Sequence, residues 1–125
     1  MIQDVIKKIH WLGHDGFRID SGKVIYFDPF QIKSAVPADI IFISHDHFDH
    51  CSEYDVKKIQ KKDTVIVTDA ATAKKLEGSI RVVKPGDKLT VGNIAVEVVP
   101  SYNTNKNFHP KASGMLGFIV TIEGV

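Results

Sequence analysis

The sequence predicts a layered α/β domain, in which strands buried on both faces alternate with helices and hairpins. The main indication is the segment 39–44, Asp-Ile-Ile-Phe-Ile-Ser, because four consecutive apolar residues without alternation are typical of a strand covered on two sides. The turn pairs Ser21-Gly22 and Gly92-Asn93 each separate two β-rich segments and predict hairpins. A serine followed by two acids at 52–55 predicts the start of a helix.

Turn signals between these segments give the expected order of elements. Strands are expected at residues 8–12, 16–20, 23–27, 39–44, 64–68, 80–83, 88–91, 94–99 and 117–122, with 80–83 buried. One helix is expected to begin after the N-cap Ser52, with its lysines, as far as Lys62, facing solvent. A second helix is expected over residues 70–77, with Thr68 or Asp69 as its N-cap. Aromatic and aliphatic residues expected in the core are Trp11, Phe17, Tyr54, Val56 and Ile59.

Length and composition indicate a single globular domain. The chain has 125 residues, is 43% hydrophobic and 25% charged, and carries a formal net charge of +1. No apolar run approaches the ~20 residues that cross a bilayer, and the near-neutral charge offers no track for nucleic acid. The single cysteine, Cys51, cannot form an internal disulfide, and the first residues lack the apolar core of a signal peptide, so we expect a cytoplasmic protein.

Three of the six histidines gather in one short segment, His45-Asp46-His47-Phe48-Asp49-His50. This segment leaves the carboxyl end of the buried strand, where open α/β sheets place their ligand sites. In an extended segment, His45 and His47 point the same way and can share one ion. After the chain turns, Asp49 and His50 offer an oxygen and a nitrogen to a second ion. Imidazole and carboxylate ligands suit Zn²⁺, Mn²⁺ or Fe.

Two such ions ~3.5–4 Å apart can bring the pKa of a bridging water near neutrality, which is the chemistry of hydrolysis. The alternative is a purely structural role, in which the three histidines cap the strand and the helix through hydrogen bonds. We favour the metal site, because three imidazoles and two carboxylates gathered without a metal would be electrostatically and sterically unfavourable.

The motif and its preceding strand resemble the signature of the metallo-β-lactamase superfamily. His10-Trp11-Leu12-Gly13-His14 and Ile25-Tyr26-Phe27-Asp28-Pro29-Phe30 extend the resemblance to the branch of predicted Zn-dependent hydrolases that includes ascorbate-6-phosphate lactonase. The resemblance implies an αββα sandwich of two ββα halves. It implies that His45 and His47 bind one metal and that Asp49 and His50 bind the other. Asp49 would also be catalytic, orienting the bridging water or accepting its proton.

The resemblance also implies an incomplete ligand set. In the superfamily a metal-bridging aspartate and a late histidine come from the second half of the fold, whereas no Asp or His follows His109 here. We therefore expect residues 1–125 to be the N-terminal ββα half of a longer domain. The alternative is a genuine half-domain that pairs with a second copy or with another chain.

Four further residues are candidates near the metals. The third ligand of the first metal is expected from the loop after the strand 94–99. His109 is favoured there over Asn103, because imidazole is the better ligand for a borderline ion. His14 is a candidate for supporting the ligands or binding substrate, or else a histidine bonded to backbone. Asp28 is a candidate for supporting the ligands, or else a turn cap.

These observations predict a metal-dependent hydrolase that uses a hydroxide bound to two divalent ions. The ions are expected to be Zn, with Mn or Fe as alternatives, and the substrate a small ester, lactone, amide or phosphodiester. Lys106 and Lys111 lie on either side of His109 in the sequence. They could attract an anionic substrate, or they could simply be solvated loop residues. The alternative function is a non-catalytic or assembly-dependent metal-binding half-domain. The motif does not choose the substrate.

Overall fold

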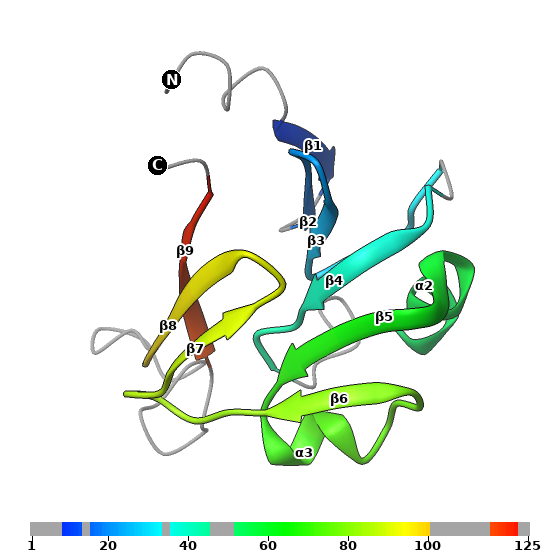
Figure 1. The fold of residues 1–125 in the computed structure, drawn as a ribbon. Helices are drawn as coiled ribbons and strands as arrows, with labels where there is room; N and C mark the ends of the chain where they lie inside the picture. Colours follow the sequence, from blue (N-terminus) through cyan, green and yellow to red (C-terminus); the bar gives the residue numbers. More distant parts are fainter. Residues whose placement is uncertain (1–8, 14–15, 34–35, 46–51, 101–115, 123–125) are drawn as a thin grey trace.

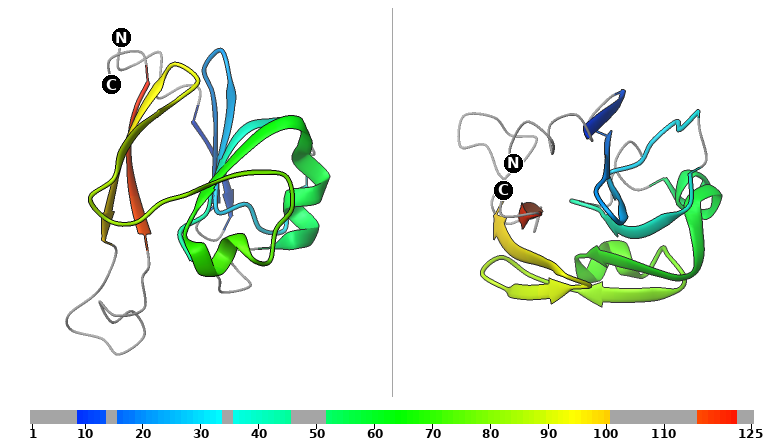
Figure 2. Two further views of the ribbon diagram at one scale, coloured as in Figure 1. Left: turned by 60° about the horizontal axis from the view of Figure 1, so that its bottom comes forward. Right: turned by 45° about the horizontal axis from the view of Figure 1, so that its top comes forward.

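The chain forms two β-sheets and a layer of helices in the computed structural model, which describes residues 9–13, 16–33, 36–45, 52–100 and 116–122. The layers run in the order small sheet, large sheet, helices, so that the helices lie on the outer face of the large sheet (Figures 1 and 2). This order is the predicted ββα architecture, and the α/β fold class is confirmed.

The large sheet has six strands in the order of the chain, and the small sheet has three. The helices within the described residues are α2 (Glu53–Ile59) and α3 (Ala70–Ala73). The large sheet contains β1 (Ile9–Gly13), β2 (Gly16–Asp20), β3 (Val24–Phe27), β4 (Ala38–Phe42), β5 (Gln60–Thr68) and β6 (Ser79–Val82), and the small sheet contains β7 (Lys88–Val91), β8 (Ile94–Pro100) and β9 (Leu116–Thr121). Strands β1 to β3 pair antiparallel, whereas β3 to β6 pair parallel.

Strand β4 is the centre of the core. Its residues Ile40, Ile41 and Phe42 are 0–2% exposed, because one face meets the small sheet and the other meets the helices. The Phe42 ring stacks on Phe27 of β3, with ring centroids 5.0 Å apart, and tilts against Phe118 of β9 at the same separation. Phe42 therefore joins the two sheets, and the uninterrupted apolar run predicted a strand buried on both faces correctly.

Both helix caps follow the predicted chemistry. The Ser52 hydroxyl accepts the Asp55 amide at 3.2 Å, and the Asp69 carboxylate accepts the Thr72 amide at 2.8 Å. Both helices are shorter than expected. Helix α2 ends at Ile59 because β5 already begins at Gln60, pairing with β4, and α3 ends at Ala73. Among the described residues, no helix is long and apolar enough to cross a membrane.

Four expectations of burial were wrong, each at an edge of the molecule. Trp11 is 70% and Phe17 40% exposed, because the small sheet faces only part of the larger one and leaves the inner face of β1 and β2 open (Figure 2). The Tyr54 ring lies outside α2, with the Lys58 ammonium 4.7 Å from its centroid. Strand β6 is an edge strand in the described sheet, so Val82 faces solvent.

Strand β9 lies at one edge of the small sheet, with β8 as its neighbour in the described structure. Its sequence, Leu-Gly-Phe-Ile-Val-Thr, contains no charged residue and no proline, and its pairing with β8 runs without a bulge. The exposed Ile119 on this strand adds to its apolar character.

We predict that Phe42→Ala lowers the free energy of unfolding by about 3–5 kcal/mol, because it opens a cavity between two aromatic neighbours. Urea unfolding monitored by circular dichroism measures this loss. Phe17→Ala is the matched control: Phe17 occupies the same row of the sheet but is 40% exposed, so its loss should be roughly 1 kcal/mol. Equal losses in the two variants would contradict the central role of Phe42.

Candidate metal centre

The parallel pairing of β3 and β4 brings two candidate residues to one edge of the sheet. Phe27 and Phe42 are register partners, so the residues after them leave the sheet side by side. Asp28 follows β3, and Ser44 and His45 follow β4 after Ile43. This edge is formed by the carboxyl ends of parallel strands, where α/β proteins bind their ligands.

The Asp28 carboxylate holds the residue that precedes the histidine cluster. Its Oδ1 accepts the Ser44 backbone amide at 2.7 Å, and its Oδ2 accepts the Ser44 hydroxyl at 2.8 Å. The Asp28 amide in turn donates to the Phe42 carbonyl at 2.8 Å. Asp28 therefore supports the start of the cluster. Whether Asp28 supports metal ligands stays a prediction; its hydrogen bonds are to Ser44, which immediately precedes His45.

The contact between Ser44 and His45 indicates which nitrogen of the imidazole carries the proton. Ser44 Oγ lies 2.8 Å from His45 Nδ1. A serine hydroxyl has one proton, and here it points to the Asp28 carboxylate, so Oγ accepts a hydrogen bond from Nδ1–H. The lone pair of the ring then resides on Nε2, which exposes less than 1 Å² to solvent. A buried imidazole presenting Nε2 in this way fits the requirements of a metal ligand.

Two other candidate segments begin and end at the same edge. Residues 14–15 connect β1 to β2, and Phe17 of β2 pairs with Phe27, which immediately precedes Asp28. The segment 101–115 connects β8 to β9, and its flanking residues Pro100 and Leu116 are register partners. The Leu116 amide donates to the Ser44 carbonyl at 2.9 Å, so the residues that flank this segment lie near Ser44.

Of the candidate site residues, Asp28 and His45 belong to the described part of the chain. The others, His14, His47, Asp49, His50, Asn103 and His109, lie outside the described residues. Within the described ranges, no group of three histidine, cysteine or acidic side chains is arranged to hold a metal ion. The assignment of the metal ligands therefore stays a prediction, supported by the geometry of their flanking residues.

A second carboxylate near this edge was not expected from the sequence. Asp55, in the first turn of α2, is 3% exposed, and its Oδ2 and Oδ1 accept the backbone amides of Gln31 at 2.8 Å and Ile32 at 2.9 Å. From the sequence, Asp55 was expected only to place a favourable negative charge at the start of a helix. A polar group at a core position of the 3.6-residue repeat, beside Val56 and Ile59, was the signal that could have revealed it.

The environment of Asp55 stabilises its ionised form. Burial by itself raises the pKa of this carboxyl. Hydrogen bonds from the Ser52 hydroxyl and from the Ile32 and Gln31 amides, together with the Lys58 charge, outweigh burial and bring the pKa below its ordinary value of 3.8. The carboxylate is therefore ionised and fully hydrogen-bonded at neutral pH.

The segment between the two carboxylates adopts an uncommon backbone conformation. Asp28 has φ 43° and Gln31 has φ 53°, the two positive values among the described non-glycine residues. Such conformations cost of order 1–3 kcal/mol each and persist only where neighbouring contacts enforce them. Here those contacts are the Asp28 hydrogen bonds to Ser44 and the Asp55 hydrogen bonds to Gln31 and Ile32.

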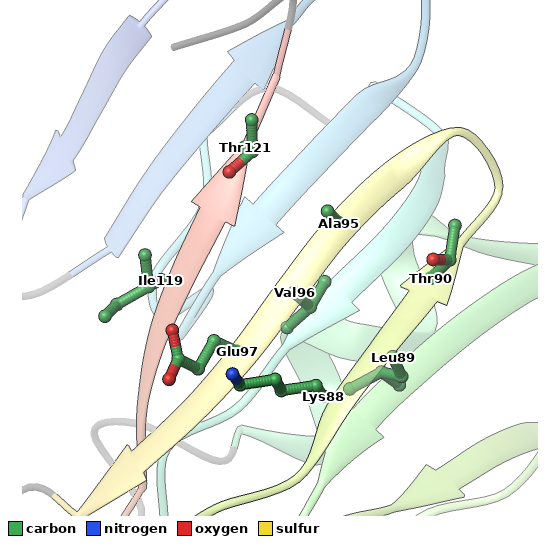
Figure 3. A pocket seen from close by; sticks show the side chains of 8 residues that line it. All are labelled: Lys88, Leu89, Thr90, Ala95, Val96, Glu97, Ile119 and Thr121. Atoms are coloured by element: carbon green, nitrogen blue, oxygen red, sulfur yellow. The ribbon is translucent and has the colours of Figure 1, made fainter.

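A hollow on the small sheet is a separate feature. It lies over β7, β8 and β9 (Figure 3). Lys88 and Glu97, register partners on β7 and β8, stand beside each other within it. None of its lining residues is a candidate metal ligand, so it offers no argument for the site. Those residues are Lys88, Leu89, Thr90, Ala95, Val96, Glu97, Ile119 and Thr121.

Comparison with known families agrees with this edge-of-sheet geometry. The family model described as the β-lactamase superfamily domain matches residues 8–125. The chain belongs to this superfamily. The resemblance inferred from the histidine motif is confirmed, and so is the fold that it implied.

Relatives of the chain are named as metal-dependent hydrolases. A UPF0173 metal-dependent hydrolase from Methanoregula boonei is 28% identical over 123 residues, covering 92% of this chain and 54% of the relative. The crystal structure of a Parabacteroides distasonis protein, assigned as a metal-dependent hydrolase, has a TM-score of 0.83 and 31% identity and covers 94% of this chain and 56% of that one. A Thermotoga maritima structure assigned to the metallo-β-lactamase superfamily, with a TM-score of 0.52 and 24% identity over 94% of this chain and 45% of that one, supports the fold alone.

The chain spans about half the length of the relatives that it matches. This agrees with the expectation that the ββα unit corresponds to one half of the superfamily fold. The activity, substrates and partners of the whole protein are therefore matters of proposal.

We predict that the imidazole of His45 in the metal-free chain carries its proton on Nδ1, because Ser44 Oγ is already a donor to Asp28. Nitrogen chemical shifts of the ring, measured by NMR at alkaline pH, distinguish the two tautomers. In Ser44→Ala the preference for Nδ1–H should be lost. The exposed His10 gives the internal control, and a proton on Nε2 of His45 in the unmodified chain would contradict the assignment.

We predict that the free energy of unfolding decreases at acid pH because the stabilising contribution of the ionised Asp55 carboxylate is lost. Because its pKa in the folded chain lies below its ordinary value of 3.8, its contribution is present above about pH 4 and is lost as the pH falls through the lowered folded value. Urea unfolding from about pH 7 to about pH 3 measures this. The stability difference between the unmodified chain and Asp55→Asn should shrink as the pH falls, and a difference independent of pH would refute this role.

Proposed function

We propose that this chain provides the metal-binding half of a metal-dependent hydrolase. The observation that carries the proposal is the buried His45 imidazole, whose Nδ1 lies 2.8 Å from Ser44 Oγ. In the proposed centre its Nε2 is the coordinating atom. The names of the relatives support the general class of reaction. The two-metal chemistry and the substrate are extensions of that class.

The proposed ligands follow the motif. His45 and His47 hold one ion, Asp49 and His50 hold a second, and His109 supplies a further nitrogen to the first. The Leu116–Ser44 hydrogen bond supports the role of His109, because the segment that contains it ends beside His45. Asn103 is the alternative donor in that segment. The donor set favours Zn²⁺ and is compatible with Mn²⁺ or Fe.

The protein's contribution is to orient the ligands. When bound, divalent ions would bring the pKa of water towards neutrality and polarise the oxygen atom that is attacked in the substrate. Asp28 and Ser44 fix the tautomer and orientation of His45, and the hydrophobic packing of β4 holds Ser44 in place. Asp49 is the proposed catalytic residue, accepting a proton from the attacking water.

The proposed substrate is a small molecule with a hydrolysable ester, lactone, amide or phosphodiester bond. An anionic group on it would be matched by Lys106 and Lys111. Because the chain spans about half of its relatives, a second proposal is that the unit binds metal but hydrolyses substrate only after association with the remaining half or with another copy. The cytoplasmic location expected from the sequence stays a prediction.

We predict that the chain purified without chelator retains close to two metal ions per molecule, measured by elemental mass spectrometry. The double variant His45→Ala/His47→Ala should lose them, because two imidazole ligands are removed. His10→Ala is the matched control, since His10 lies on β1 and pairs with Asp20 at 3.2 Å. It should retain the metal content of the unmodified chain.

Metal content in the unmodified chain no higher than in the double variant would refute the proposed metal centre. A panel of ester, lactone, amide and phosphodiester substrates then separates the two proposals. Hydrolysis that disappears in the double variant supports a complete enzyme. Metal retention without turnover supports the assembly-dependent half-domain.

A further inference from the structure

One short segment connects the two flanks of the histidine cluster. Residues 28–32 are bound at their start to Ser44, just before His45, through the Asp28 carboxylate. They are bound at their end to α2, which follows the cluster, through the Asp55 carboxylate. We call residues 28–32 the brace. In the sequence the cluster lies between Ser44 and α2, so the brace is hydrogen-bonded to the described residues on both sides of it.

Asp55 is bound more extensively than a helix start requires. The capping acceptor for α2 is the Ser52 hydroxyl, which accepts the Asp55 amide and donates to its carboxylate at 2.6 Å. The Asp55 carboxylate also accepts the Gln31 and Ile32 amides of the brace, and its Oδ1 lies 3.5 Å from the Lys58 ammonium on its own helix. Lys58 adds a third connection, because its ammonium donates to the Ile32 carbonyl at 2.9 Å.

The conformation of the brace explains why such contacts are needed. Gln31 is exposed and adopts φ 53°, a region that side-chain-bearing residues rarely occupy. Its own side chain is not in the core, so the backbone contacts with Asp55 oppose relaxation to negative φ. Because Asp28 lies three residues earlier and also has positive φ, relaxation at Gln31 would shift the carboxylate that holds Ser44.

We propose that Asp55 is a positioning residue for His45, acting through the brace. Asp55 fixes Gln31 and Ile32, the brace fixes Asp28, and Asp28 fixes Ser44 and thereby the His45 ring. The role of His45 as a ligand rests on the proposed function, whereas the mechanical link from Asp55 to Ser44 does not. Asp55 itself contacts neither Ser44 nor His45 in the described hydrogen bonds, so the link is indirect.

The first experiment needs no metal. Hydrogen exchange of the metal-free 125-residue chain, followed by NMR, reports the Ser44 amide that donates to Asp28. In Asp55→Asn this amide should exchange about tenfold faster, after correction for any change in global stability. Asp39→Asn is the matched control, since Asp39 also joins two segments, accepting the Val24 amide at 2.7 Å and the Lys61 ammonium at 2.7 Å. It should leave the Ser44 amide unchanged.

The second experiment measures metal affinity by titrating the same chains with Co²⁺ and following its visible absorption. Asp55→Asn should weaken Co²⁺ binding about 10- to 100-fold relative to Asp39→Asn, as expected when a group that orients a metal ligand is removed. Adding Gln31→Gly to Asp55→Asn should recover part of this loss, because glycine adopts positive φ without strain. A merely structural role for Asp55 predicts no such recovery.

The outcomes separate this inference from the proposed function. If the unmodified chain binds no Co²⁺ beyond the level of His45→Ala/His47→Ala, the proposed function fails, and with it the role of Asp55 toward a ligand. If the unmodified chain binds Co²⁺ but Asp55→Asn and Asp39→Asn share the same affinity and the same Ser44 exchange, the inference alone is overturned. Faster Ser44 exchange, weaker binding and recovery by Gln31→Gly together support it.

Discussion

The parallel pairing of β3 with β4 is the constraint on which the candidate site depends. Parallel strands in register end at the same edge, so residues 17 positions apart in sequence, Asp28 and His45, leave the sheet as neighbours. The stacking of Phe27 on Phe42 fixes that register from within the core. The polar contacts at the edge are thus a consequence of apolar packing one residue further inside.

The same edge also gathers segments that are distant in the chain. The adjoining ends of β1 and β2 lie there because β2 is antiparallel to both of its neighbours, and the ends of β8 and β9 lie there because the small sheet packs on β4. The site is therefore built by topology first and by individual side chains second. This order of dependence explains why a superfamily can keep its fold while its loops diversify.

Local patterns predicted the strands and caps well. The apolar run of β4, the turn pair of the first hairpin and the Ser52 cap were each readable from a few neighbouring residues. The errors came from properties that no local window contains. Trp11 is apolar, yet it is exposed because the opposing sheet is narrower. The helix after Ser52 is amphipathic to Lys62, yet pairing with β4 draws Gln60 and the following residues into a strand.

The candidate site divides in the same way. The composition and spacing of the histidine cluster mark its candidate ligands, so His45 could be proposed as one before any fold was known. The supporting groups are marked less clearly, because the sequence left Asp28 as either a support for the ligands or a turn cap, and Asp55 was expected only as a charge at a helix start. Asp28 and Asp55 are ordinary acids in turn and helix-start positions, and their roles follow from backbone amides more than ten residues away. Residue spacing identifies candidate metal ligands more readily than it identifies the groups that hold those ligands in position.

The edges of the two sheets differ in how well they resist association with other chains. Strand β1 has a bulge between Trp11 and Gly13, β6 carries Arg81 and β7 carries Lys88, features that discourage an incoming strand. Strand β9 combines β-branched and aromatic residues with no charge. It is therefore the edge at which this chain, handled alone at high concentration, should recruit further strands and begin to aggregate.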